Sequence, residues 1–291
     1  MVAPAAPAAA TRPRGAPFPT RVGGLESGVV TDDALLVLLG RAADAAGDAL
    51  ARSARHLVEG SASQHHSDLA TDDAVLGVLT GAGLGVLSEE SGLRPGSTSD
   101  LVVVVDPLDG STNAAAHLPW YATSLCVVDG DGPRVALVRN LATGEEFRAV
   151  RGGGATCDGR PLRSPAARTE ELADAVVLLS GHAREHLGWR QYRALGALAL
   201  DLCAVAAGRV DAYLDCSVDA HGVWDYLGGL LVAREAGIDV EDVHGRDLMV
   251  LDHDARRTPV AGPVGLRRRL RAAWPRASGQ PLRTGTDGGA G

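Results

Sequence analysis

The chain of 291 residues has few aromatic residues and no lysine, and both shortages limit what it can be. Aromatic residues make up 3% of the sequence and apolar residues 45%, so a folded core must consist mainly of Ala, Val and Leu. The formal net charge is -8, and every cation is Arg or His. Because general nucleic-acid binding depends on cations that neutralise phosphates, we expect no nucleic-acid partner.

Sparse cysteines and short apolar runs exclude two further classes. The four cysteines are far apart and form no C-x-x-C pair, which argues against a disulfide framework and favours a reducing compartment. No apolar run approaches the roughly 18 residues of a membrane helix. Prolines interrupt the Ala-rich start, which is unlike a signal peptide. These features predict a cytoplasmic protein with no membrane partner.

The pattern of the chain predicts one layered domain. We expect an Ala/Pro-rich disordered tail over 1–24, a single domain over 25–275 with lobes of about 25–150 and 151–275, and a disordered tail over 276–291. Expected helices cover 31–57, 73–79, 189–207 and 223–236, and expected strands cover 101–105, 123–128, 135–138, 146–151, 176–179 and 212–214. Strands in the middle with helices on both sides indicate an α/β or α+β layered fold.

Acidic residues follow apolar stretches in four short segments. The segments are DLATDD (68–73), VLSEESG (86–92), VDPLDGSTN (105–113) and VWDYLGG (223–229). In the third segment, Asp106 and Asp109 leave a buried strand through a turn that Pro107 favours. Two carboxylates held together repel each other unless a cation lies between them, and Mg²⁺ prefers carboxylate and carbonyl oxygens. The segment therefore predicts a metal site.

The residues after Asp109 suit an anion. Gly110, Ser111 and Thr112 are expected to open a helix, and free N–H groups at a helix N-terminus bind phosphate. Metal-binding acids beside an anion site indicate phosphoryl transfer.

The strings DPLDGSTN, SEESG and WDYLGGLLVAREAG resemble the metal-binding signatures of the inositol monophosphatase family. GGGATCDGRPLR and LGALALDLCAVAAGRVDAY resemble its connecting segments, and the resemblance extends from Thr31 to Ala261. It implies an alternating α-β-α-β-α sandwich of the inositol monophosphatase and fructose-bisphosphatase type. It also implies a homodimer and two or three Mg²⁺ ions at each site.

The resemblance assigns roles to individual residues. The implied metal ligands are Glu89, Asp106, Leu108 through its carbonyl group, Asp109 and Asp225. The implied catalytic residues are Glu89, Ser111, which polarises the attacking water, and Asp72, the base that pairs with Ser111. The implied substrate-binding residues are Gly110, Ser111 and Thr112, at the phosphate, and Asp215, at a hydroxyl of the leaving group. The implied activity is a Mg²⁺-dependent phosphomonoesterase that hydrolyses a small phosphorylated metabolite, similar to inositol monophosphate, by metal-activated water attack.

Two segments depart from the family pattern. The second-helix motif places Asp72 and Asp73 side by side, and Asp72 fits better because Val75 and Leu79 then lie on the buried face. The run from Asp215 to Gly222 is longer than in inositol-specific members, so we expect a reshaped leaving-group pocket. Histidinol phosphate or a nucleotide-derived phosphate of the 3′-phosphoadenosine type are alternative substrates. A non-catalytic member that binds a phosphorylated ligand is the alternative from another class.

Two motifs suggest unrelated functions. His182 to His186 satisfies the H-x-x-E-H pattern of inverted zinc proteases, whose histidines share one helix face. The basic run from Arg267 to Arg271, with Trp274, suggests contact with nucleic acid. We expect both to be ordinary surface segments.

Overall fold

The computed structural model describes residues 30–58, 64–163 and 169–282. The predicted tail over 1–24 lies outside the described residues, as does most of the one predicted over 276–291. The fold below is that of the unit that begins at Thr31. No helix of the described part of the chain is both long and apolar enough to cross a membrane.

Two sheets organise this unit. The first has the order β2-β1-β3-β4-β5-β6-β7-β8, and only β1 and β3 pair in parallel. Its strands are β1 (Gly85–Ser88), β2 (Gly92–Arg94), β3 (Val102–Asp109), β4 (Ala122–Asp129), β5 (Gly132–Asn140), β6 (Glu146–Val150), β7 (Gly154–Cys157) and β8 (Arg160–Leu162). The second has the order β10-β9-β11-β13-β12. Its strands are β9 (Val176–Ser180), β10 (Gln191–Arg193), β11 (Ala212–Asp215), β12 (Asp239–Asp242) and β13 (Pro259–Gly262).

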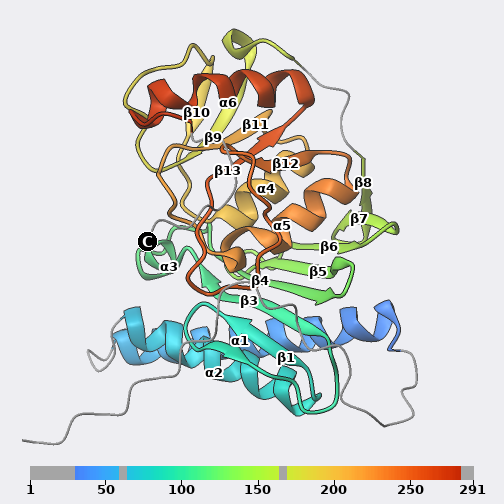
Figure 1. The fold of residues 1–291 in the computed structure, drawn as a ribbon. Helices are drawn as coiled ribbons and strands as arrows, with labels where there is room; N and C mark the ends of the chain where they lie inside the picture. Colours follow the sequence, from blue (N-terminus) through green and yellow to red (C-terminus); the bar gives the residue numbers. More distant parts are fainter. Residues whose placement is uncertain (1–29, 59–63, 164–168, 283–291) are drawn as a thin grey trace, which may run out of the picture. The chain divides into compact units, whose positions relative to one another are not determined.

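Helices cover both sheets and fill the space between them (Figure 1). They are α1 (Asp32–Val58), α2 (Gln64–Gly81), α3 (Ser111–Ala115), α4 (Leu198–Ala206), α5 (Val223–Glu235) and α6 (Val264–Ser278). One core joins α1 and α2 to the first sheet, a second joins α4 and α5 to both sheets, and a third joins α6 to the second sheet. The expected α-β-α-β-α sandwich is confirmed.

Strand β3 shows why the expected valine run is continuous. Val103 and Val105 belong to the core under α1 and α2, whereas Val102 and Val104 belong to the core with α4 and α5. A strand buried on both faces needs apolar residues at every position. Asp106 and Asp109, two of the acids predicted to bind metal, lie in the last half of this strand.

Three predicted elements differ in the structure. The expected helix over 189–207 is wrong in its first half, where β10 forms an edge strand and α4 begins only at Leu198. Gly196, with a φ of 82°, interrupts the helical pattern, since this left-handed conformation favours glycine. The helix expected over 73–79 is longer, since α2 begins at Gln64 and ends at Gly81. The expected turn after Val105 is a continuation of β3 to Asp109.

Glycines on α5 allow it to pack closely against its neighbours. A Cβ atom on Gly228 would lie 2.5 Å from Ser124 Oγ on β4. A Cβ atom on Gly229 would lie 2.7 Å from the carbonyl oxygen of Ala199 on α4. Because that oxygen belongs to a helix backbone, it cannot move aside without shifting α4.

We therefore expect Gly229→Ala to lower the free energy of unfolding by about 1–3 kcal/mol through overpacking. Gly77→Ala is the matched control, because Gly77 is an exposed residue of α2 with no atom near its Cβ position. In a helix interior this change normally stabilises by about 1 kcal/mol. Urea unfolding followed by circular dichroism measures both, and effects of the same sign would contradict the packing argument.

Candidate metal centre

Three carboxylates from distant parts of the chain meet at one place. Glu89 follows β1, Asp106 lies in β3, and Asp225 lies in the first turn of α5. One carboxylate oxygen from each lies within 4.8 Å of those of the other two. An all-oxygen donor set of this kind fits a hard divalent cation. The structure thus brings together three of the five predicted metal ligands.

A β-bulge sets the direction of the acids on β3. Asp106 pairs with Ser124 and Asp109 pairs with Ala122. The strand β3 therefore advances by three residues where β4 advances by two, so β3 contains one extra residue. Pro107 lies within the bulge, and Thr123 Oγ1 donates a 2.9 Å hydrogen bond to its carbonyl oxygen. Bulges redirect side chains and are frequent beside active sites. Leu108, whose carbonyl group was predicted as a ligand, lies in this bulge and donates its N–H to Asp106 Oδ1 at 3.0 Å.

Mutual repulsion and burial disfavour the ionised forms of these acids. Burial and the negative charge of Asp225 raise the pKa of Glu89 to about 7. Burial, then the charges of Glu89 and Asp109, raise the pKa of Asp106 well above its usual value. A cation among the carboxylates would remove this cost, because it attracts all of them at once. The chemistry of the donor set therefore fits a bound metal.

Asp109 lies beside this group and is held by α4. Its Oδ2 accepts a 2.8 Å hydrogen bond from the N–H of Ala199, in the first turn of that helix. Burial and the charge of Asp225 raise the pKa of Asp109, which shows that the two carboxylates act on each other. Its predicted role in a second metal site stays a prediction.

The predicted phosphate-binding residues begin α3. Gly110 has a φ of 83°, and a Cβ atom there would lie 3.0 Å from the carbonyl oxygens of Gly196 and Trp120. Asn113 donates hydrogen bonds of 2.7 Å to the carbonyl oxygens of Trp120 and Leu195. These contacts fix the turn that carries Ser111 and Thr112. Phosphate binding at Gly110, Ser111 and Thr112 stays a prediction.

The structure distinguishes the two neighbouring acids of α2. Asp72 is buried and accepts a 2.5 Å hydrogen bond from the Ser88 hydroxyl at the end of β1. Asp73 is exposed. Asp72 therefore points toward the strand that leads to Glu89, and α2 contacts α3, where Ser111 lies. This arrangement favours Asp72 over Asp73 for the predicted role of base.

Asp215, predicted to bind a substrate hydroxyl, lies at the end of β11 with a fully buried side chain. Its Oδ1 accepts a 2.8 Å hydrogen bond from the N–H of Ser217. Burial raises its pKa to about 6, although the neighbouring His221 lowers it. Its predicted contact with substrate stays a prediction.

Sequence reasoning missed two histidines at the site. His221 precedes α5 and lies within 3.5 Å of both Asp215 and Asp225. Burial alone would lower its pKa, but Asp225 and Asp215 raise it to about 9. His253, between β12 and β13, stacks on Trp224 with ring centroids 4.6 Å apart, and its Nε2 lies 3.0 Å from the carbonyl oxygen of Glu89. No motif marks either residue; the only signal is that His221 lies four positions before Asp225.

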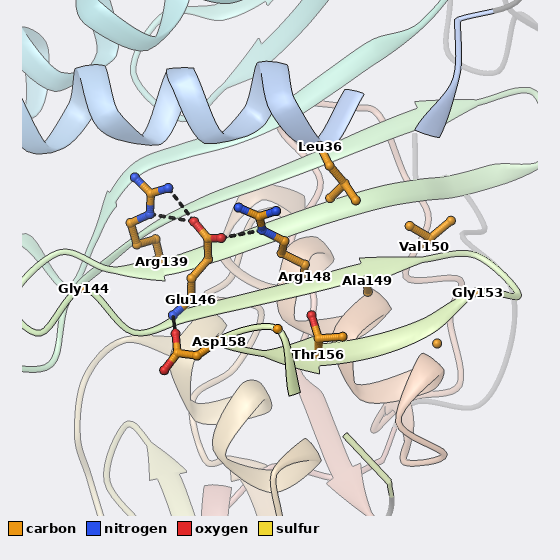
Figure 2. Close-up of a pocket in the computed structure, with 12 residues that line it drawn as sticks. Leu36, Arg139, Gly144, Glu146, Arg148, Ala149, Val150, Gly153, Thr156 and Asp158 are labelled. Atoms are coloured by element: carbon orange, nitrogen blue, oxygen red, sulfur yellow. Dashed lines mark hydrogen bonds and ion pairs between the residues drawn. The ribbon is translucent and has the colours of Figure 1, made fainter. Parts of the chain in front are cut away.

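A second acidic cluster and a surface concavity lie outside the candidate site, and charged side chains in each form ion pairs within the protein. Glu145, Cys157 and Asp158 could also hold a metal ion, but Arg209 already forms an ion pair with Glu145. A concavity of about 720 Å³ next to β6 and β7 contains none of the predicted site residues. Figure 2 shows Arg139 and Arg148 in this concavity, both turned toward Glu146. We assign no function to either group.

The two unrelated motifs differ in the structure from the patterns that suggested their functions. The residues from His182 to His186 are not helical, so the two histidines do not share a helix face. Trp274 is fully buried and donates a hydrogen bond to the carbonyl oxygen of Asp215, so it cannot stack on a base. Arg267 is buried too and pairs with Asp239 and Glu241.

Fold and site together define a layered α/β protein with a carboxylate centre suited to divalent metal. Comparisons with known proteins agree. A model of the inositol monophosphatase family matches residues 41–274. The Nus factor SuhB of Salmonella typhimurium is 35% identical over 175 residues, 55% of this chain and 63% of that protein. The inositol-1-monophosphatase of Mesorhizobium japonicum is 36% identical over 199 residues, 62% of this chain and 71% of that protein.

A solved structure extends the similarity to most of the fold. The extragenic suppressor protein suhB from Bartonella henselae superposes with a TM-score of 0.71 at 28% identity, covering 83% of this chain and 99% of that one. The chain belongs to the inositol monophosphatase family. Its match spans less than two thirds of the length of the SuhB relative from Salmonella.

The raised pKa of Glu89 predicts a pH dependence of stability. A carboxyl group with a folded pKa of about 7 and an ordinary value of 4.5 stabilises the folded state fully below 4.5 and loses this contribution as pH rises through 7. We expect the melting temperature of metal-free protein to fall between pH 4.5 and 7, and to fall less in Glu89→Gln. Calorimetry in EDTA tests this, and equal slopes in the two proteins would contradict it.

Proposed function

We propose that the protein is a Mg²⁺-dependent phosphomonoesterase that acts on a small phosphorylated metabolite. The convergence of Glu89, Asp106 and Asp225 is the observation that carries the proposal. Family membership supports the reaction class, and a relative named inositol-1-monophosphatase supports a substrate similar to inositol monophosphate. Histidinol phosphate and 3′-phosphoadenosine-type phosphates remain alternative substrates, because residues 215–222 form a longer connection than in inositol-specific members.

Each residue of the site has a distinct role in this proposal. Glu89, Asp106 and Asp225 would hold Mg²⁺ among them, and Asp109 and the Leu108 carbonyl group would contribute further ligands. When bound, the metal ions neutralise phosphate charge and acidify a water molecule. Gly110, Ser111 and Thr112 orient the phosphate with their N–H groups, which the fixed turn at Gly110 keeps in place. Asp72 accepts the proton that Ser111 transmits from the attacking water.

A non-catalytic phospholigand-binding protein is the second candidate. The relative from Salmonella is named a Nus factor, not a phosphatase, which favours this alternative. For the same reason, the absence of a nucleic-acid partner stays a prediction. We also expect a homodimer in the cytoplasm, as the family resemblance and the sparse cysteines suggested.

A screen of phosphate monoesters with Mg²⁺ separates the candidates. It includes inositol 1-phosphate, histidinol phosphate and 3′-phosphoadenosine 5′-phosphate, and it measures released phosphate and, by calorimetry, binding. Release of phosphate supports the enzyme. Binding without release at any pH between 6 and 9 would overturn it and favour the second candidate.

Asp106→Asn tests the site itself. We expect turnover to fall at least about 100-fold, since one carboxylate of the metal centre is lost. The melting temperature in EDTA should not fall, because the change removes a buried charge that its neighbours repel. Asp73→Asn, at an exposed position of α2, is the control and should keep full activity. Near-normal turnover of Asp106→Asn would exclude the site.

Replacing Mg²⁺ by Ca²⁺ tests the metal. Ca²⁺ accepts more ligands at longer distances and tolerates irregular geometry, so it should bind the carboxylates without aligning the reactants. We expect Ca²⁺ to inhibit phosphate release in competition with Mg²⁺. Undiminished activity with Ca²⁺ as the sole divalent ion would argue against this metal centre.

A further inference from the structure

The connection between β11 and α5 places a histidine between two acids. His221 Nε2 lies 3.5 Å from Asp215 Oδ2, and His221 Nδ1 lies 3.4 Å from Asp225 Oδ2. The side chain of Asp215 is fully buried, whereas those of His221 and Asp225 are each 19% exposed. His221 therefore separates the buried acid from the metal centre.

The backbone of this connection is fixed by contacts with the segment before β13. His221 exchanges two backbone hydrogen bonds with Arg257, of 3.3 and 2.8 Å. Asp219 has a φ of 49° and forms an ion pair with Arg246, with 2.7 Å between the charged atoms. Its N–H donates a 3.1 Å hydrogen bond to Thr258 Oγ1. These backbone and side-chain contacts hold His221 in its position.

Asp215 and His221 each have a buried polar atom for which the other is the nearest suitable hydrogen-bond partner. Asp215 Oδ1 is used by the N–H of Ser217, but Asp215 Oδ2 and His221 Nε2 are buried without a hydrogen-bond partner among the described residues. An unpaired buried carboxylate oxygen is costly, and the imidazole is the donor beside it. A small closure of the 3.5 Å separation would satisfy both atoms. Asp215 has no exposed surface with which to contact a substrate.

On its other side, His221 acts on one oxygen of Asp225. Asp225 Oδ2 accepts the N–H of Gly222 at 2.7 Å and faces His221 Nδ1. Two donors on Oδ2 fix the carboxylate plane and leave Oδ1 for a cation. The arrangement matches the general rule that partners behind metal ligands orient them.

We infer that His221 is a positioning residue that orients Asp225 for metal binding, and that Asp215 acts on the site through His221 instead of contacting the substrate. The inference deepens the proposed function and rests on it for the metal centre. It concerns the affinity for the metal, so it can be tested even if no phosphate ester is hydrolysed.

Titration calorimetry with Mg²⁺ alone tests the inference on the full chain. We expect His221→Leu and Asp215→Asn each to raise the dissociation constant for Mg²⁺ at least about 10-fold. The double variant should be no weaker than His221→Leu, because coupled residues are not additive. His182→Leu, at an exposed histidine after β9, is the control and should bind Mg²⁺ normally. If His221→Leu does not fold, His221→Gln takes its place, since its amide can donate to one carboxylate only and should give a smaller loss.

Kinetics with inositol 1-phosphate at saturating Mg²⁺ provide the second measurement. The KM of Asp215→Asn should then equal that of the unaltered protein, because metal excess compensates for weaker binding. Unchanged Mg²⁺ affinity in both single variants would overturn the inference, as would additive losses in the double variant. A raised KM in Asp215→Asn with normal Mg²⁺ affinity would instead establish direct contact with substrate. Normal metal binding in all variants, with no hydrolysis of any ester in the screen, would contradict both the inference and the proposed function. The expected losses of metal affinity, with no hydrolysis of any ester in the screen, would contradict only the proposed function.

Discussion

Repulsion among carboxylates is the constraint on which the site depends. Glu89, Asp106 and Asp225 come from three separate segments, and burial raises the pKa of the first two. Acids kept together in a poorly solvated place cost stability unless a cation binds among them. The fold must therefore hold the acids in place independently of the metal. The bulged end of β3 and the first turn of α5 provide this support for Asp106 and Asp225.

Ala199 shows how packing and chemistry are connected. Its N–H donates to Asp109, while its carbonyl oxygen lies where a side chain on Gly229 would have to go. Gly229 belongs to the same helix as Asp225, so the close approach of α4 and α5 fixes the distance between two acids of the site. The sequence WDYLGG thus combines an acid of the candidate metal centre with the small residues that let its helix approach α4.

Local patterns predicted the elements whose surroundings are uniform. The valine run of β3 is buried on both faces, and the amphipathic pattern from Thr31 predicted α1 almost to the residue. Local sequence patterns gave wrong predictions where strand pairing or a single backbone conformation determines the structure. The turn expected after Val105 is a bulged strand because the chain pairs with β4 as far as Asp109. The helix expected from Trp189 begins nine residues later because Gly196 takes a left-handed conformation and β10 pairs with β9.

The acids of the candidate metal centre could be predicted and His221 could not, and the reason is physical. Asp106 stands out because it follows an apolar run, and Glu89 and Asp225 because each belongs to a short motif of the family. A residue that orients a ligand can come from any segment that the fold brings near. His221 reaches its place because the connection between β11 and α5 forms hydrogen bonds with residues 257 and 258. Asp215 lies at the end of β11, and the connection that follows places the imidazole of His221 beside its carboxylate. A role assigned by position along the chain therefore needs to be weighed against what surrounds the side chain in the fold.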